Sequence, residues 1–199
     1  MAGSVESGAM TEFHFEHHLF WDFSLRVYGN DGVPAACIEL QERRGIDVNL
    51  LLFCAWIGES GRGILDQSDL DAALAATSAW NRDIVCSLRV VRDRLKGGMP
   101  PIPTERSHTL RKMILEIEVK CEHVEQTALI AAVSRSADST VTSEQRVGDA
   151  VTSVAAYFRR HGFSPNADDA KQVAIVLDPA FPEISRAALE ERFLSAAAT

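Results

Sequence analysis

Two histidines and an aspartate recur at intervals of four residues near the start of the chain. They are His14, His18 and Asp22. If a helix begins by residue 14, this spacing places all three side chains on one face. Two imidazoles one turn apart can ligate a metal ion, and a carboxylate one turn further along can supply a third ligand. The trio is therefore a candidate metal site. A solvated polar face is the alternative interpretation, because no fourth ligand is identifiable.

A second candidate site combines polar and aromatic side chains from two segments. Asp47 precedes an apolar run in which Asn49 is the polar exception, so a buried Asn49 amide needs hydrogen-bond partners. One interpretation makes Asp47 a helix cap and Asn49 a satisfied core amide. The other places both in a ligand pocket between the first and third helices. The residues assigned to that ligand-binding site are Trp21, Asp22, Asp47, Asn49 and Trp56.

Basic side chains surround the predicted turn between two long helices. Between residues 89 and 112, seven lysines and arginines are opposed by only two acidic residues, Asp93 and Glu105. Positive charge near the start of the second helix is unfavourable for the helix dipole, so we expect this hairpin tip to bind an anionic partner. A solvated charged end is the alternative. The residues assigned to partner binding are Arg89, Arg92, Arg94, Lys96, Arg106, Arg111 and Lys112.

Other spacings resemble known sites but lack a required part. Residues 58–63 contain three glycines but no phosphate-binding lysine. An acidic run on the second long helix suggests a di-metal site, but Lys120 stands where that pattern needs glutamate, so we expect these side chains to face solvent. The run comprises Glu116, Glu118, Glu122, His123 and Glu125.

The four cysteines lack a Cys-x-x-Cys spacing, which disfavours zinc and disulfides. No cofactor is predicted.

Hydrophobic periodicity predicts helices along the whole chain. We expect an all-α bundle of seven or eight helices, at residues 15–28, 33–44, 48–57, 68–96, 104–134, 144–161, 167–177 and 183–197. The third of these is apolar on nearly every side, which is typical of a helix at the centre of a domain. The two longest carry stripes at alternating steps of four and three, which predicts a long antiparallel hairpin. The stripes run from Leu70 through Asn81, Ile84 and Val91 to Leu95, and from Leu110 through Ile114, Ile117, Cys121 and Val124 to Ala131.

Composition indicates an ordinary globular protein. The 199 residues are 46% hydrophobic and carry a net charge of −8, which disfavours nucleic acid and anionic membranes as partners. No apolar run is long enough to cross a bilayer and no secretory signal is recognisable, so we expect a cytoplasmic protein. We expect residues 1–13 to be disordered, residues 14–133 to form a helical core, and residues 134–199 to form a C-terminal extension packed on that core.

Two sequence phrases resemble those of a known family. They are WDFSLxxY at residues 21–28 and GxDVNLLLFCxW at residues 45–56, and a third similar phrase begins at Trp80. These phrases are similar to those of a family of small bacterial proteins known only as a domain of unknown function, and the similarity extends over residues 19–132. The resemblance implies a bacterial, cytoplasmic, helical protein, and it brings no activity, cofactor or catalytic residue with it.

These features lead to one hypothesis about function and one alternative. We expect a non-enzymatic interaction or regulatory protein that binds an acidic protein or another anionic partner through the basic hairpin tip, with a homodimer as a further arrangement to test. The alternative is a small-ligand or metal-binding protein, including an enzyme, with its site between the first and third helices.

Overall fold

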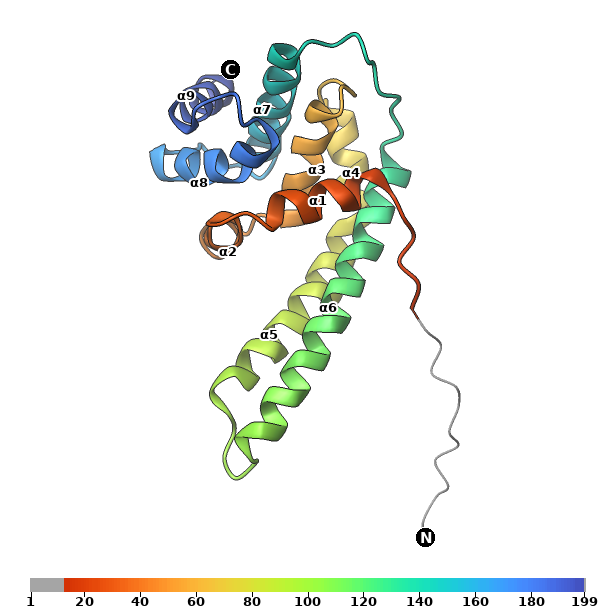
Figure 1. Cartoon of the computed structure of the whole chain (residues 1–199), viewed down its shortest axis with the longest axis vertical. Coiled ribbons are helices and arrows are strands. Elements are labelled where there is room, and N and C mark those ends of the chain that lie inside the picture. The colour runs from red at the N-terminus through yellow and green to blue at the C-terminus, as the bar shows by residue number, and fades with distance from the viewer. Residues whose placement is uncertain (1–12, 199) are drawn as a thin grey trace.

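The computed structural model describes residues 13–198, which form an all-α fold (Figure 1). Its helices are α1 (Leu19–Tyr28), α2 (Val33–Arg44), α3 (Val48–Glu59), α4 (Gln67–Trp80), α5 (Cys86–Arg94), α6 (Thr104–Ala132), α7 (Ser143–Arg160), α8 (Ala167–Leu177) and α9 (Arg186–Ala197). A π-helix at Asn81–Val85 joins α4 to α5, and short 3₁₀ turns lie at Leu95–Gly97 and Asp178–Ala180. The predicted fold class is confirmed. The segment expected to be disordered falls mainly on residues 1–12, outside the described residues.

Helix α3 lies at the centre of the molecule. All its residues from Asn49 to Gly58 are buried. Asp47 caps the helix, since its Oδ1 accepts the backbone N–H groups of Asn49 at 2.9 Å and Leu50 at 3.3 Å. Helices α1 and α6 contact α3, and α7 packs along it most extensively, with α8 and α9 packed on α7 or on each other. The all-round apolar character of this segment is therefore explained by neighbours on several sides.

Helices α4, α5 and α6 form the predicted antiparallel hairpin. The π-helix continues α4 into α5, and this combined arm packs against α6 along its length. The far part of the hairpin, made of α5 and the first half of α6, extends away from the remaining helices (Figure 1). None of the helices in residues 13–198 has the length and apolar composition that a bilayer crossing requires.

The apolar stripe predicted as the hairpin seam on α6 faces largely outward, with Ile114, Cys121 and Ala128 half-buried. Leu110, Ile117 and Val124 are exposed. The acidic run that was expected to face solvent lies largely inside instead, so that prediction is wrong. Its buried members are Glu118, His123 and Glu125. Helix α6 is therefore rotated relative to the expectation, with the carboxylates of Glu118 and Glu125 in the seam beside buried aliphatic residues such as Leu129.

The π-helix explains the change of seam on the opposite arm. Its wider turn holds one more residue than an α-helical turn, which rotates the following residues by about 100° relative to an uninterrupted α-helix. Val85 is consequently buried, and Arg89 and Arg92 are half-buried against α6. The predicted seam residues Ile84 and Val91 are exposed instead.

Candidate functional site

The predicted metal trio does not share a helical face. Helix α1 begins only after His18, whose Nδ1 accepts the backbone N–H of Trp21 at 3.0 Å and so caps the helix. Asp22 pairs instead with His17, whose Nε2 lies 2.9 Å from the carboxylate. The helical spacing assumed from His14 onward is therefore wrong. In the described part of the chain, no group of three or more His, Cys, Asp or Glu side chains is arranged to hold a metal ion.

Trp21 lies in an aromatic cluster between α1 and α6. Its ring stacks on Phe15 with centroids 5.6 Å apart, and it meets the buried His123 ring at 4.9 Å in an edge-on geometry. His123 Nε2 also lies 2.8 Å from the carbonyl oxygen of Glu16. These contacts fix the segment before α1 on the surface of α6. Trp21 therefore has a structural role that is separate from the pocket described below.

A cluster of buried polar side chains lies where α3 meets the π-helix and α6. Glu125 is at its centre, with 1% of its surface exposed. Its Oε2 accepts the side-chain amides of Asn49 at 2.8 Å and Asn81 at 3.3 Å. The neighbouring Gln126 donates to Asn49 Oδ1 at 2.9 Å and to Ser24 at 3.1 Å. Asn49 thus has the partners that a buried amide needs, and α6 supplies them.

The carboxyl groups of Glu125 and Asp47 influence each other's protonation in this cluster. The charge of Asp47 acts directly on Glu125, and two ionised carboxylates there would repel each other. Burial, and then the Asp47 charge, raises the pKa of Glu125 to about 9. Burial raises the pKa of Asp47 too, but the backbone N–H groups at the start of α3 favour its charged form. We therefore assign the proton to Glu125 at neutral pH.

A second layer of charge lies further along the hairpin. The carboxylate of Glu118, which is 3% exposed, accepts hydrogen bonds from Arg89 at 2.9 Å and Arg92 at 2.6 Å. Arg89 also pairs with Glu122 at 2.8 Å and donates to Gln41 of α2. Burial raises the pKa of Glu122 to about 7. Two of the seven residues assigned to partner binding thus face inward, because the π-helix turns them toward α6.

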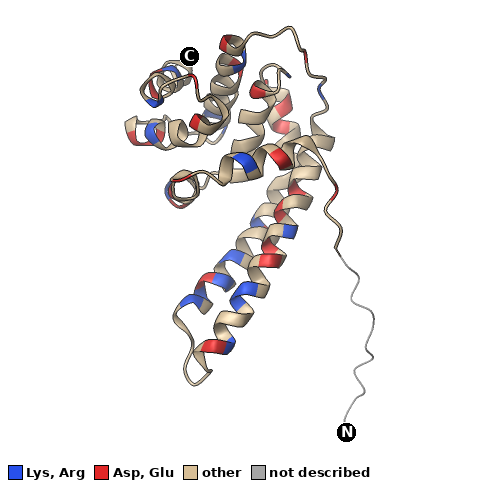
Figure 2. Ribbon diagram, viewed as in Figure 1, with Lys and Arg blue, Asp and Glu red and all other residues tan. Residues whose placement is uncertain are grey.

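The remaining basic residues of the hairpin lie outside this seam. Arg94, Lys96, Arg106 and Lys112 are exposed, and none forms an ion pair with a described residue. Arg111 is half-buried, and its Nε has no hydrogen-bond partner in residues 13–198. Figure 2 shows basic positions on both arms of the hairpin, with few acidic positions near its end. The predicted basic tip is therefore smaller than expected but retains four exposed cations.

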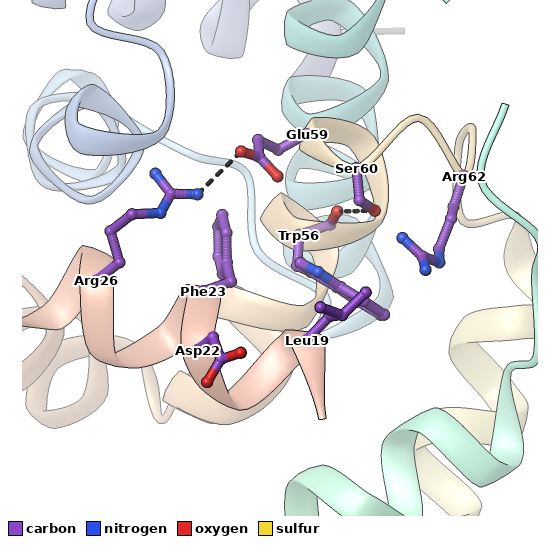
Figure 3. A pocket seen from close by; sticks show the side chains of 8 residues that line it. All are labelled: Leu19, Asp22, Phe23, Arg26, Trp56, Glu59, Ser60 and Arg62. Carbon is purple, nitrogen blue, oxygen red and sulfur yellow. Dashed lines mark hydrogen bonds and ion pairs between the residues drawn. The ribbon is translucent and has the colours of Figure 1, made fainter. Parts of the chain in front are cut away.

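A pocket of about 340 Å³ opens between α1 and α3 (Figure 3). Leu19, Phe23 and Trp56 supply its apolar wall. Arg26 and Glu59 form an ion pair of 2.9 Å on one side of it. The pocket is open to solvent, in contrast to the buried cluster around Glu125.

The predicted ligand-binding residues are divided among three places. Asp22 and Trp56 line the α1–α3 pocket, Asp47 and Asn49 belong to the buried cluster, and Trp21 lies in the aromatic cluster. Glu125 and Gln126 were not predicted as site residues, because the acidic side chains of α6 were expected to face solvent. The spacing could have indicated this, since Glu118, Cys121 and Glu125 follow steps of three and four and therefore share one face of the helix. Also not predicted was Arg62, which lies in the glycine-rich loop after α3 and lines the pocket.

A family model supports the resemblance found in the sequence. The model described as "Protein of unknown function (DUF2390)" matches residues 19–129, which is more than half of the chain. The chain belongs to this family. Its DUF2390 region spans α1 to most of α6, and thus contains the Glu125 cluster, the α1–α3 pocket and the hairpin, whereas α7–α9 lie beyond it. No curated protein and no solved structure gives a significant match.

Proposed function

We propose that this protein is a cytoplasmic, non-enzymatic interaction protein whose projecting hairpin binds an acidic partner. The observation that carries the proposal is the inverted distribution of polar and apolar side chains on the hairpin. In the far part of the hairpin, charged groups occupy the seam where Glu118 meets Arg89 and Arg92, and large apolar side chains such as Leu110, Met113 and Ile117 lie outside. A hairpin serving only as a structural arm needs the opposite distribution, because apolar burial is what stabilises helix pairing.

The exposed apolar residues of α6 form a stripe along one face. Leu110, Met113 and Ile117 have exposed fractions of 50%, 53% and 46%, and Val124 continues the stripe at 38%. Steps of three, four and seven keep these positions on one side of a helix. A contiguous exposed stripe of this kind favours contact with the apolar face of a partner helix.

Unpaired positive charge lies at the same end of the hairpin as the start of this stripe. The four exposed cations are Arg94, Lys96, Arg106 and Lys112. Positive groups around an apolar contact steer and select partners that carry acidic side chains. The whole chain has a net charge of −8, which disfavours nucleic acid or an anionic membrane relative to an acidic protein. These observations support an acidic amphipathic segment as the bound element.

Photo-cross-linking in the native cells tests the proposal. A photoreactive amino acid replaces Thr109, an exposed residue beside the stripe. We expect an adduct with an acidic protein. Reversal of Arg94, Lys96, Arg106 and Lys112 to glutamate should abolish that adduct, because charge complementarity is then lost. The control Lys171→Glu reverses an exposed charge on α8, away from the hairpin, and should leave the adduct in place.

Two results would reject the acidic partner. One is an adduct whose yield is unchanged by the four charge reversals. The other is an adduct with a second copy of the chain, which would replace the proposed partner with self-association and predict a dimer in sedimentation equilibrium. Absence of any protein adduct from position 109 would likewise count against the hairpin as a binding surface.

A further inference from the structure

The α1–α3 pocket contains a cation, Arg62, that has no carboxylate of residues 13–198 within ion-pair distance, and the charge of Glu59 acts on it from further away. Asp22 and Arg26, which line the same pocket, each have a side-chain partner, His17 for Asp22 and Glu59 for Arg26. Arg62 forms no ion pair with a described residue, and its Nε donates to the carbonyl oxygen of Arg135 at 3.1 Å. Figure 3 shows the Arg62 guanidinium turned toward the pocket. The pocket therefore presents a positive group whose terminal N–H groups are available to an anion.

The loop that carries Arg62 is held in place by the chain beyond α6. The N–H of Asp138 donates to the Gly61 carbonyl at 2.9 Å, and the Arg146 side chain donates to the Glu59 carbonyl at 2.8 Å. Gly61 has a φ of +74°, and a Cβ there would lie 2.7 Å from the Asp138 carbonyl oxygen. Because the loop is fixed in this way, Arg62 loses little conformational freedom when an anion binds.

Arg62 also lies against the aromatic part of the pocket wall. Its guanidinium carbon is 4.3 Å from the centre of the Trp56 ring. Burial lowers the pKa of Arg62, which reflects the reduced hydration of its charge. A carboxylate beside it would replace that lost hydration with charge-assisted hydrogen bonds. Asp22 and Glu59 line the same pocket, so a ligand with two negative charges is disfavoured.

We propose that this pocket binds a small monocarboxylate with an aromatic body. The carboxylate accepts hydrogen bonds from the terminal N–H groups of Arg62, and the ring lies against Leu19, Phe23 and Trp56. The volume of about 340 Å³ is near the lower end for ligand pockets, which suits one ring with a short acid chain. This site is separate from the hairpin, so a negative result for one proposal does not affect the other.

Isothermal titration of the full chain with three acids tests the site. The acids are phenylacetate, 3-phenylpropionate and indole-3-acetate, each compared with its neutral amide. We expect at least one acid to bind with a Kd below about 1 mM. We expect its amide to bind at least about tenfold more weakly, because it lacks the charge that Arg62 recognises. Arg62→Gln should reduce acid binding to the level of the amide, and the control Arg82→Gln, on the π-helix, should not.

A second variant separates binding from folding. Leu19 lines the pocket with 61% of its surface exposed, so Leu19→Asp adds a negative charge at the rim without disturbing the core. It should weaken acid binding by about tenfold while leaving the melting temperature unchanged. The proposal is overturned if none of the three acids binds with a Kd below about 1 mM. It is also overturned if Arg62→Gln and Leu19→Asp both bind the acids as the wild type does.

Discussion

Among single residues, Glu125 and Asp47 place the strictest limit on protonation, because both carboxyl groups are not favoured in the ionised form together. Glu125 is buried and Asp47 is half-buried beside it, so ionisation of both carboxyl groups is unfavourable. A protonated Glu125 fits its surroundings, since Oε2 still accepts the amides of Asn49 and Asn81 and the uncharged acid avoids repulsion by Asp47. A glutamine side chain has the same shape and offers the same pattern of donor and acceptor.

We expect Glu125→Gln to preserve the fold and to alter the pH dependence of stability. The pKa of Glu125 is raised from 4.5 to about 9. Between these values the folded chain keeps a proton that the unfolded chain has lost, so the free energy of unfolding falls as the pH rises. The variant lacks this contribution, and at about pH 9 it should exceed the wild type in stability by at least about 1 kcal/mol. Urea unfolding at about pH 5, 7 and 9 measures the difference.

The control for this prediction is Glu125→Ala, which removes the partner of both amides. It should be less stable than the wild type at about pH 5, because the buried Asn49 and the half-buried Asn81 then lose an acceptor. Wild-type and Glu125→Gln stabilities that change in parallel from about pH 5 to pH 9 would show that Glu125 is ionised in the folded chain.

At the scale of elements, the π-helix between α4 and α5 decides which side chains meet across the hairpin. It turns Arg89 and Arg92 toward Glu118 and leaves Ile84 and Val91 in solvent. The ion pairs form on the inside of the hairpin for this reason, and the arm can remain folded while its aliphatic residues point outward.

Deletion of Asp83 should convert the π-helix into a regular α-helical turn. Asp83 is exposed, so its loss converts the wide turn to an α-helical one and rotates the following arm by about 100°. Glu118 is then buried without Arg89 and Arg92, and we expect destabilisation of about 3–5 kcal/mol. Thermal unfolding followed by circular dichroism measures it. The point variant Asp83→Ala keeps the turn and should change stability by less than about 0.5 kcal/mol. Equal melting temperatures for the two variants would contradict this role of the π-helix.

Local chemistry predicted most elements but not their rotation. Helix α2 has the predicted bounds, because Gly32 and Gly45 adopt left-handed conformations that interrupt the helix at each end. Helix α1 starts later than predicted, because the His18 ring caps it, which a periodic pattern does not reveal. The π-helix is stabilised partly by a distant contact, Asn81 with Glu125, so no local signal marks it. The late start of α1 separates the predicted metal trio, and the π-helix turns two of the seven predicted tip residues inward.

At the scale of the whole molecule, helices beyond the DUF2390 match complete the core around α3. The two regions approach closely at Gly58, where an added Cβ would lie 2.2 Å from the backbone nitrogen of Ala150 on α7. Buried Val147, Val151 and Val154 follow α7 on either side of this crossing. The close approach of α3 and α7 therefore depends on the absence of a side chain at one position.

We expect Gly58→Ala to push α3 and α7 apart and to lower the free energy of unfolding by about 1–3 kcal/mol. The matched control is Gly148→Ala on α7, where a Cβ meets no atom within 4 Å. That control should raise stability by about 0.5–1 kcal/mol, since alanine is the better helix former. Urea unfolding of both variants provides the comparison. If the two substitutions have equal effects, the contact does not limit the packing of α7 on α3.

We propose that the outer stripe of the hairpin contacts a partner and does not stabilise the fold. The most direct measurement combines two readouts on the triple variant Leu110→Ser/Met113→Ser/Ile117→Ser. These are the free energy of unfolding in urea and the photo-cross-link from position 109. We predict a stability change below about 0.5 kcal/mol per substitution and loss of the cross-link. If the free energy of unfolding falls by about 2 kcal/mol or more per substitution and the cross-link is retained, the stripe stabilises the fold itself. That result would contradict its proposed role in binding a partner.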